Sequence, residues 1–330
     1  MRSPAPIDIH AHFYPEAYLR LVAEEGDRHG IGCVWNEGEL PVIDIGAVSM
    51  PIERRYYDLQ ARLESMDRQG VSVHALSLTQ PMVYWAPATL AKRLSELFND
   101  ACMDAYKAYP TRFAGLAMLP MNAPDLALAE LDRIVGRPGI CGIYMGTRIG
   151  DLELSDPSLF PVYEAIEDVG FAVFLHPIRV MEPQRLRKFY LTNLIGNPTE
   201  TVVAASHLMF GGVLDRFPDL TFCLPHAGGS LPYLIGRITH GWKVRPECRH
   251  LDNPPDTYLR RFHYDTISHS HAALEHLVSL VGADRVVMGS DFCFDMSCRR
   301  PVEFVGRSAG LTEAEKSLIL SGNARRLLAM

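Results

Sequence analysis

The sequence of 330 residues lacks the features that would direct it to a membrane or to nucleic acid. No apolar run approaches the roughly 18 residues that span a bilayer. The N-terminal stretch MRSPAPIDIH has no apolar signal-peptide core. Acidic residues outnumber basic ones and give a net charge of −7, which argues against a polyanionic partner. We therefore expect a cytoplasmic protein with no nucleic-acid or membrane partner.

Cysteine is sparse and follows no regular spacing. The seven cysteines are scattered and odd in number, which argues against a disulfide scaffold and favours reduced thiols. The chain also lacks internal repeats and a glycine-rich phosphate loop after its first apolar run. Hydrophobic residues make up 48% of the chain, which is ample for one large core. The function must therefore be sought in the polar residues of a single globular chain.

Short apolar runs alternate along the chain with segments of helical periodicity. The predicted strands are 7–12, 71–79, 113–120, 140–147, 171–176, 220–225, 262–267 and 285–290. The predicted helices are 58–69, 87–109, 124–135, 157–169, 199–210, 272–281 and 313–320. Such alternation builds a parallel sheet, and eight strands predict an α/β fold, a (β/α)8 TIM barrel that spans 1–330 as one domain. A doubly wound open sheet is the alternative.

Two predicted connections are too long to be simple turns. Residues 13–57 follow the first strand and contain CVWNEGELPVIDI, whose pattern predicts a small antiparallel hairpin inserted over the barrel mouth. Residues 178–198 follow the fifth strand. Long loops inside compact domains are usually lids or binding loops. Both begin at carboxyl ends of strands, where barrel enzymes assemble their active sites.

Polar residues stand at the carboxyl ends of four predicted strands. The first strand ends in DIHAH, which places His10 and His12 on one face. The fifth ends at His176, the sixth leads into His226, and the eighth leads into Asp291. Three imidazoles and one carboxylate suit a divalent transition ion, with zinc expected and manganese as the alternative. Because the carboxyl ends of barrel strands share one face, the sequence predicts a metal site there, with a fourth imidazole beside it.

The other histidines are expected to lie outside the metal site. His74, inside VSVHALSL, is predicted to be a core residue, and His207 is predicted to pack on an apolar helical face. His269 and His271 form a second His-x-His pair just beyond the seventh strand, near the mouth but at the start of a helix. A lone strand-end histidine is usually structural, so the prediction depends on the four strand ends taken together.

These motifs resemble the metal-dependent amidohydrolase superfamily. The order Asp-x-His-x-His, His-Pro, His-Ala-Gly-Gly and Gly-Ser-Asp, with GGVLDRFP and GNARRLL, is most similar to one branch of it. That branch contains α-amino-β-carboxymuconate-ε-semialdehyde decarboxylase and related aromatic-acid decarboxylases. The resemblance covers essentially the whole chain and is weakest in 13–57 and 178–190.

The resemblance implies a metal-dependent non-oxidative decarboxylase, a carboxy-lyase. Its substrate would be a small carboxylate, an aromatic or ring-cleavage-derived unsaturated acid. The implied metal ligands are His10, His12, His176 and Asp291. His226 and Asp291 are the implied catalytic residues, with His226 beside the ion as the group that moves a proton.

Substrate carboxylates call for cations, preferably the guanidinium fork of arginine. Arg237 matches a position that, in this family, reaches the active site across a dimer interface, so a homodimer or higher homo-oligomer is implied. Where the family has an arginine after the first strand this chain has Met50, and Tyr190 stands in place of a tryptophan. The candidate substrate-binding residues are therefore Arg54, Arg55, Arg179, Tyr190 and Arg237. The departures leave the particular acid open.

The same ligand set could serve other chemistry. A metal-dependent hydrolase of a C–C, amide or lactone bond, or a hydratase, would use an activated water as the nucleophile. A non-enzymatic barrel that keeps the ion only for structure or ligand sensing is a third reading. The presence of both His226 and Asp291 argues against the third.

Overall fold

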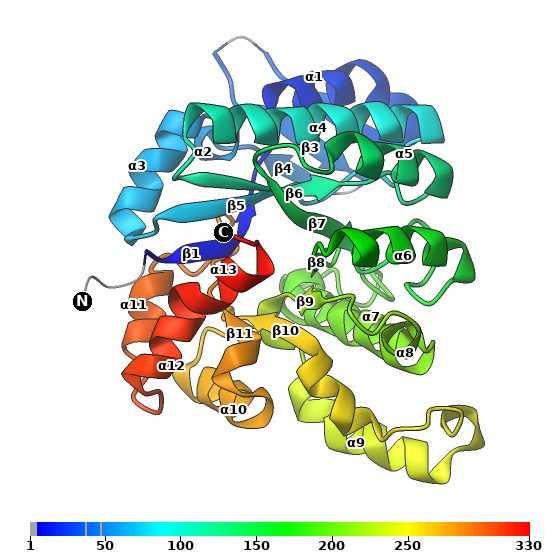
Figure 1. Ribbon diagram of the computed structural model, residues 1–330. Coiled ribbons are helices and arrows are strands. Elements are labelled where there is room, and N and C mark those ends of the chain that lie inside the picture. Colours follow the sequence, from blue (N-terminus) through cyan, green and yellow to red (C-terminus); the bar gives the residue numbers. More distant parts are fainter. Residues whose placement is uncertain (1–4, 37, 47) are drawn as a thin grey trace.

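A computed structural model describes residues 5–36, 38–46 and 48–330. Its centre is one eight-stranded sheet in the order β1-β5-β6-β7-β8-β9-β10-β11, and all seven neighbouring pairs are parallel (Figure 1). The strands are β1 (Ile7–His12), β5 (Val73–Ser77), β6 (Phe113–Met118), β7 (Ile140–Gly146), β8 (Val173–His176), β9 (Phe222–Leu224), β10 (Phe262–Asp265) and β11 (Val286–Val287). Each lies within a predicted strand.

The sheet closes where residues 288–292, which continue from β11, run beside β1. The backbone N–H of His12 donates to the carbonyl oxygen of Phe292 at 2.7 Å, and the N–H of Phe292 donates to the carbonyl of His10 at 3.2 Å. We call this contact between β1 and residues 288–292 the seam. It joins the first and last strands, and it confirms the predicted (β/α)8 barrel.

Helices surround the barrel on its outside (Figure 1). They are α1 (Glu16–Glu25), α2 (Arg54–Tyr57), α3 (Leu59–Gln69), α4 (Ala88–Ala108), α5 (Pro124–Ile134), α6 (Phe160–Val169), α7 (Asn197–Phe210), α8 (Val213–Arg216), α9 (Leu231–Val244), α10 (His271–Val281), α11 (Pro301–Gly306), α12 (Glu313–Ser317) and α13 (Asn323–Leu327). The predicted helices omit α1, α2, α8, α9, α11 and α13. The longest of these is α9, in which Gly236 and Gly241 lower helix propensity. Burial of Leu231 and Ile235 on one face of α9 supplies the tertiary packing that offsets this.

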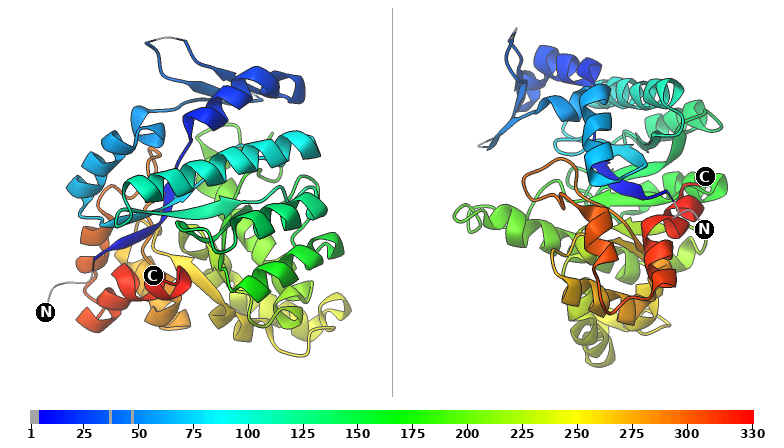
Figure 2. Two further views of the ribbon diagram at one scale, coloured as in Figure 1. Left: turned by 45° about the horizontal axis from the view of Figure 1, so that its top comes forward. Right: turned by 90° about the vertical axis from the view of Figure 1, so that its left-hand side faces the viewer.

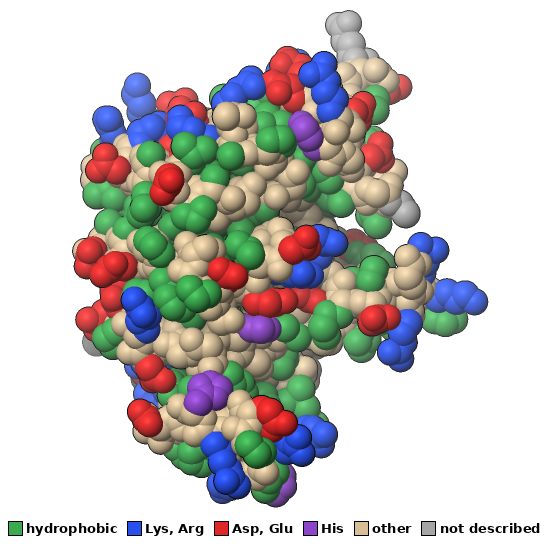
Figure 3. Space-filling model, turned by 90° about the vertical axis from the view of Figure 1, so that its right-hand side faces the viewer, with side chains coloured by type: hydrophobic (Ala, Val, Ile, Leu, Met, Phe, Trp, Pro, Cys, Tyr) green, Lys and Arg blue, Asp and Glu red, His purple; other side chains and the backbone are tan. Residues whose placement is uncertain are grey.

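The inserted segment after β1 forms a small antiparallel sheet. The predicted hairpin is present as β2 (Ile31–Val34) and β3 (Val42–Ile45), and β4 (Val48–Pro51) adds a third strand beside β3. This sheet and the segment 177–196 project from the same side of the barrel (Figure 2, right). Seen from the opposite direction, 177–196 is a projection that carries lysine and arginine side chains (Figure 3).

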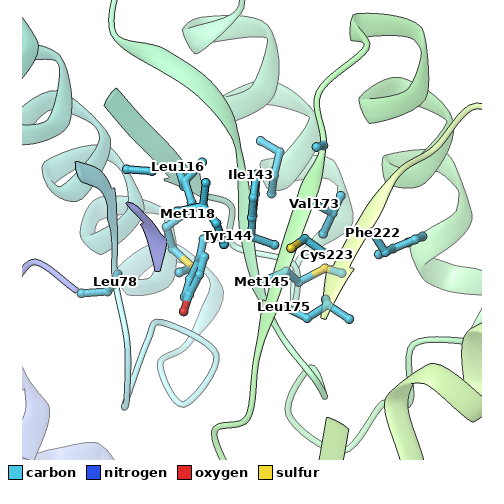
Figure 4. Packing of buried hydrophobic residues seen from close by; sticks show 14 of the residues in the cluster. Leu78, Leu116, Met118, Ile143, Tyr144, Met145, Val173, Leu175, Phe222 and Cys223 are labelled. Atoms are coloured by element: carbon cyan, nitrogen blue, oxygen red, sulfur yellow. The ribbon is translucent and has the colours of Figure 1, made fainter. Parts of the chain in front are cut away.

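Buried hydrophobic side chains from successive strands pack on both faces of the sheet (Figure 4). In β7, Ile143, Tyr144 and Met145 are all buried, because a parallel strand covered by helices has no solvent face. Leu116 and Val173 pack beside them from the neighbouring strands. Polar groups therefore stand out where they occur at strand ends.

All seven cysteines are free thiols. Among the described residues, no helix has the length and apolar character needed to cross a membrane.

Candidate metal centre

Five predicted site residues occupy equivalent places at the carboxyl ends of the strands. His10 and His12 lie in the last half of β1, and His176 is the last residue of β8. His226 begins the short turn that follows β9, and Asp291 belongs to the seam. All are buried except His226, whose side chain is 15% exposed and so remains accessible from a neighbouring cavity.

The reactive atoms of these residues converge. The Nε2 atoms of His10 and His12 are 3.2 Å apart, and Oδ1 of Asp291 lies 3.4 Å and 2.9 Å from them. Donor atoms of His10, His176, His226 and Asp291 all lie within 4.8 Å of one another. His12 stands outside that group of four although its Nε2 touches two of the members. All five groups therefore surround one point, and these distances alone do not divide them into ligands and a neighbour.

The second nitrogen of each strand imidazole has its own oxygen partner. Nδ1 of His10 lies 2.8 Å from Oδ2 of Asp265, and Nδ1 of His12 lies 3.1 Å from the hydroxyl of Ser77. Nδ1 of His176 lies 3.5 Å from the hydroxyl of Thr79. A partner at Nδ1 fixes the tautomer and turns Nε2 toward the common point, which is the usual arrangement around metal-binding histidines.

The electrostatics favour unprotonated donors. Burial lowers the pKa of His12 to about 4 and that of His176 well below its usual value, so both rings are neutral near pH 7. Burial acts to raise the pKa of Asp291, but its contacts with His12 and His226 hold it well below the ordinary range. Two neutral imidazoles and a carboxylate therefore face one another. His10 is the exception, because burial acts to lower its pKa but the hydrogen bond with Asp265 raises it above the usual value.

The residues present fit a divalent transition ion. Among the described residues, the buried Nε2 of His176 has no hydrogen-bond partner, and such an orphaned group costs about 1–3 kcal/mol. The 3.2 Å between Nε2 of His10 and Nε2 of His12 matches two nitrogen ligands at about 2.1 Å from a shared ion. An ion at this point would satisfy the orphaned nitrogen.

Asp265 is a functional residue that the sequence reasoning missed. Besides His10, its carboxylate accepts the backbone N–H groups of His226 and Ala227 at 2.9 Å and 2.7 Å. Burial acts to raise its pKa, but the hydrogen bond from His10 holds it below the usual value. The sequence pattern could have identified it, because Asp265 is the last residue of the seventh barrel strand, and the predicted ligands lie at the ends of other strands.

Two site residues have left-handed backbone conformations. The φ angle is +53° at His226 and +63° at Asp291, which L-residues adopt only when their surroundings enforce it. Asp265 holds the turn at His226, as described above. On the other side, the carboxylate of Asp8 accepts the N–H of Ser290 at 3.1 Å and also its hydroxyl proton. Two buried carboxylates thus enforce the turns that present His226 and Asp291.

A cavity of about 440 Å³ opens beside His226 and Asp291. Segment 177–196, α7, α9 and α10 contribute to its wall, together with the connection after β10. The polar lining residues are Asn193, Asn197, His226, Ser268, His269, His276 and Asp291, and the larger apolar ones are Leu194, Pro198, Pro232, Ile267, Leu277 and Met296. Such a mixed wall suits a small organic molecule with a flat apolar body and a few polar groups.

The predicted substrate-binding residues lie away from the described lining of this cavity. Arg54 pairs with Asp58 at 2.6 Å, and Arg55 pairs with a neighbouring glutamate. Arg179 is exposed 3.5 Å from an aspartate, Arg237 is exposed on α9, and Tyr190 is half-exposed. Their roles in substrate binding stay predictions.

The other histidines divide as follows. His74 is fully buried, as expected for a core residue. His269 lines the cavity, whereas His271 packs against Phe304 at the start of α10. His207 lies outside the group of metal-binding donors, as expected, but its side chain is only partly buried, with 38% exposed, and its Nδ1 lies 3.0 Å from the hydroxyl of Ser155.

Comparisons with known proteins support the resemblance. A model of the family described as amidohydrolase matches residues 7–330. The chain is 33% identical to 2-amino-3-carboxymuconate-6-semialdehyde decarboxylase of Dictyostelium discoideum, over 98% of this chain and 91% of that protein. Its fold is similar to that of 5-carboxyvanillate decarboxylase from Sphingomonas paucimobilis, at 26% identity and a TM-score of 0.86, covering 99% of this chain and 100% of that one.

A further solved structure bears on the metal. It is a dihydroxybenzoic acid decarboxylase from Polaromonas sp. JS666 with bound manganese, 25% identical, with a TM-score of 0.80 over 99% of this chain and 97% of that one. Family match, fold and converging imidazoles agree with one another. The chain belongs to the amidohydrolase family.

Proposed function

We propose that the protein is a metal-dependent, non-oxidative decarboxylase of an aromatic or ring-cleavage-derived unsaturated carboxylic acid. The observation that carries the proposal is the convergence of imidazoles and a carboxylate beside an accessible His226 at the edge of the cavity. The relatives named above are decarboxylases of such acids, which supports the same reaction class here.

The proposed ligands are His10, His12, His176 and Asp291. The donor set suits zinc, and the manganese in the Polaromonas relative supports manganese as the alternative. When bound, the ion would supply a Lewis acid that fixes and polarises an oxygen of the substrate. The Nδ1 partners Asp265 and Ser77 would keep His10 and His12 in position while the substrate is exchanged.

His226 is the proposed proton donor. Its Nε2 lies 3.7 Å from Oδ2 of Asp291, and its ring faces the cavity. A proton passes from His226 to the substrate carbon that bears the carboxylate. The bond between that carbon and the carboxylate then breaks, its electron pair restores the conjugation that protonation interrupted, and CO2 leaves. Solvent returns a proton to the imidazole, so the cycle is balanced without an oxidant.

Substrate recognition is proposed to involve a second copy of the chain. Arg237 is exposed on α9, one helical turn after Tyr233, which lines the cavity. If α9 of a second copy packed against this α9, the Arg237 side chain of each copy would lie near the edge of the other copy's cavity. We propose a homodimer or higher homo-oligomer on this ground. Arg54, Arg55, Arg179 and Tyr190 stay candidates for the same task on the chain's own surface.

The test is release of CO2 from a panel of hydroxybenzoates and aminobenzoates by protein of measured metal content. We expect CO2 from at least one acid, and a loss of roughly 100-fold or more in H226A and D291A. H29A, which changes an exposed histidine, is the matched control and should keep full activity. Oxygen from water incorporated into a product without CO2 would instead establish the hydrolase or hydratase.

A further inference from the structure

Arg62 places a buried guanidinium beside the seam. It lies on α3, is 0% exposed, and is the bulkiest fully buried side chain among the described residues. Burial lowers the pKa of Arg62 to about 10, so the group stays charged near neutral pH. No ion pair joins it to a carboxylate within the described part of the chain. Burying a charge without a carboxylate partner costs free energy, so the contacts of Arg62 must compensate for the lost hydration.

The contacts of Arg62 lie on both sides of the seam. Its Nη2 donates to the carbonyl oxygen of His12, on β1. Its guanidinium carbon lies 4.8 Å from the ring centroid of Phe292, the residue that follows Asp291. A cation over an aromatic face is attractive, and more so in a desolvated place. One side chain therefore touches the strand that carries two of the proposed ligands and the segment that carries a third.

A third contact leads to His74 on the neighbouring strand β5, opposite the start of β1. Nη1 of Arg62 donates to Nδ1 of His74 at 3.3 Å. Nε2 of His74 lies 3.7 Å from Oδ2 of Asp8, whose other oxygen accepts the backbone N–H groups of His10 and Ser290. Among the described residues Nε2 of His74 has no hydrogen-bond partner, so these buried groups pack close together without forming a continuous chain of hydrogen bonds.

We propose that Arg62 is a positioning residue of the metal centre, which sets the spacing between His12 and Asp291 across the seam. The proposal rests on the ligand set of the proposed function. Nε2 of His12 and Oδ1 of Asp291 are only 2.9 Å apart, so a small movement of either backbone changes whether both reach the same ion. Arg62 touches the carbonyl of His12 itself and the ring adjacent to Asp291, which are the two places where such a movement would begin.

The test replaces Arg62 with lysine, which keeps the charge but loses the planar fork that can hold a carbonyl and a ring together. We expect R62K to bind Zn²⁺ and Mn²⁺ about 10- to 100-fold more weakly, as measured by competition with a chromophoric chelator. The visible spectrum of the Co²⁺-loaded protein should also change, because it reports ligand geometry. Neither measurement requires a substrate.

The matched control is R112K. Arg112 also donates to a backbone carbonyl, that of Ser72 at 2.9 Å, and pairs with Asp67, but it contacts no proposed ligand. R112K should keep the metal affinity and the Co²⁺ spectrum of the unaltered protein. Equal affinity and an equal spectrum in R62K would overturn the proposal, even if R62K unfolded at a lower temperature.

A second variant covers the case in which R62K does not fold. F292L keeps Arg62 and removes the ring beneath the guanidinium. We expect weaker metal binding there as well, and unchanged affinity in F292L would overturn the proposal. If the unaltered protein bound no metal, the proposed function and this inference would both be wrong, whereas metal binding insensitive to both variants contradicts only the inference.

Discussion

Asp265 connects a proposed ligand to the proposed proton donor. Its carboxylate holds Nδ1 of His10 and the backbone of His226 at once. We expect D265N to weaken metal binding by about 10- to 100-fold, because an amide is a poorer acceptor than a carboxylate. S77A should have a smaller effect, since Ser77 gives His12 only a neutral partner. Chelator competition measures both affinities.

The control for this prediction is D100N, which removes the charge of a half-exposed aspartate on α4. D100N should bind metal as the unaltered protein does. If S77A weakened metal binding more than D265N, the expectation that a charged partner matters more than a neutral one would be wrong. The position of His12 would then matter more for metal affinity than that of His10.

The site residues visible in the sequence are those that interrupt an apolar strand at its end. His176 and His226 each follow such a run, so their convergence could be predicted once eight strands were identified. Asp265 follows one too, but its main partners are backbone N–H groups that become neighbours only in the closed barrel. Arg62 lies in the segment LQARLESMDRQ, three residues after Leu59 and four before Met66, so helical spacing places it on the buried face. Its partners across the seam belong to distant parts of the chain, and the spacing does not identify them.

At the scale of elements, α4 and α5 are fixed to the barrel through one buried amide. Asn99 accepts the backbone N–H of Met118 at 2.8 Å and donates to its carbonyl at 2.9 Å and to Glu130 at 2.6 Å. N99A would leave these buried groups unpaired, so we expect the free energy of unfolding to fall by about 2–4 kcal/mol. Urea unfolding followed by tryptophan fluorescence measures the change.

The adjacent residue provides the comparison. D100A removes a partly exposed ion pair with Arg133, and such pairs contribute at most about 1 kcal/mol. If N99A and D100A lowered the unfolding free energy equally, the buried amide would not be the fixing contact. Neither variant should alter metal affinity, because both residues lie on α4, away from the proposed ligands.

Element boundaries were predicted well wherever local pattern decides them. Several predicted strands are longer than the observed ones, and the final strand departs most, because 285–290 was predicted and only Val286–Val287 forms the regular ladder. Residues 288–292 pair across the seam instead, and Asp291 takes a left-handed conformation to face the centre. The third strand of the inserted sheet, β4, was not predicted for a related reason. It is short and exposed, and it depends on pairing with β3.

At the scale of the whole molecule, buried neutral histidines make stability depend on pH. Burial lowers the pKa of His74 well below its usual value and that of His263 to about 4. The unfolded chain binds protons at these sites below about pH 6.5 while the folded chain does not, so stability is lost as pH falls. Asp8 opposes this, because burial raises its pKa to about 6. With His12 and His176 included, four buried histidines act in this direction, whereas Asp8 and His10, whose pKa values are raised, oppose it. We therefore expect lower stability at pH 5 than at pH 7 in metal-free protein.

His263 allows the effect to be measured away from the metal centre. Its ring is close to Arg285, Asp284 and Arg326, and none of these is a proposed ligand. H263F should lessen the loss of unfolding free energy between pH 7 and pH 5 by about 2 kcal/mol, as measured by urea unfolding with a chelator present. An unaltered protein equally stable at both pH values would contradict the assignment of neutral buried rings.

The seam has a consequence for biosynthesis. His12 and Asp291 are 279 positions apart in the polypeptide, yet they meet in one contact. On a translating ribosome the imidazoles of β1 emerge early, and the carboxylate they need emerges only after almost the entire barrel has been made. In the proposed enzyme all four ligands can therefore bind the ion only after the last strand has paired with the first. A bound ion would then link β1 to residues 288–292 and stabilise the closed barrel.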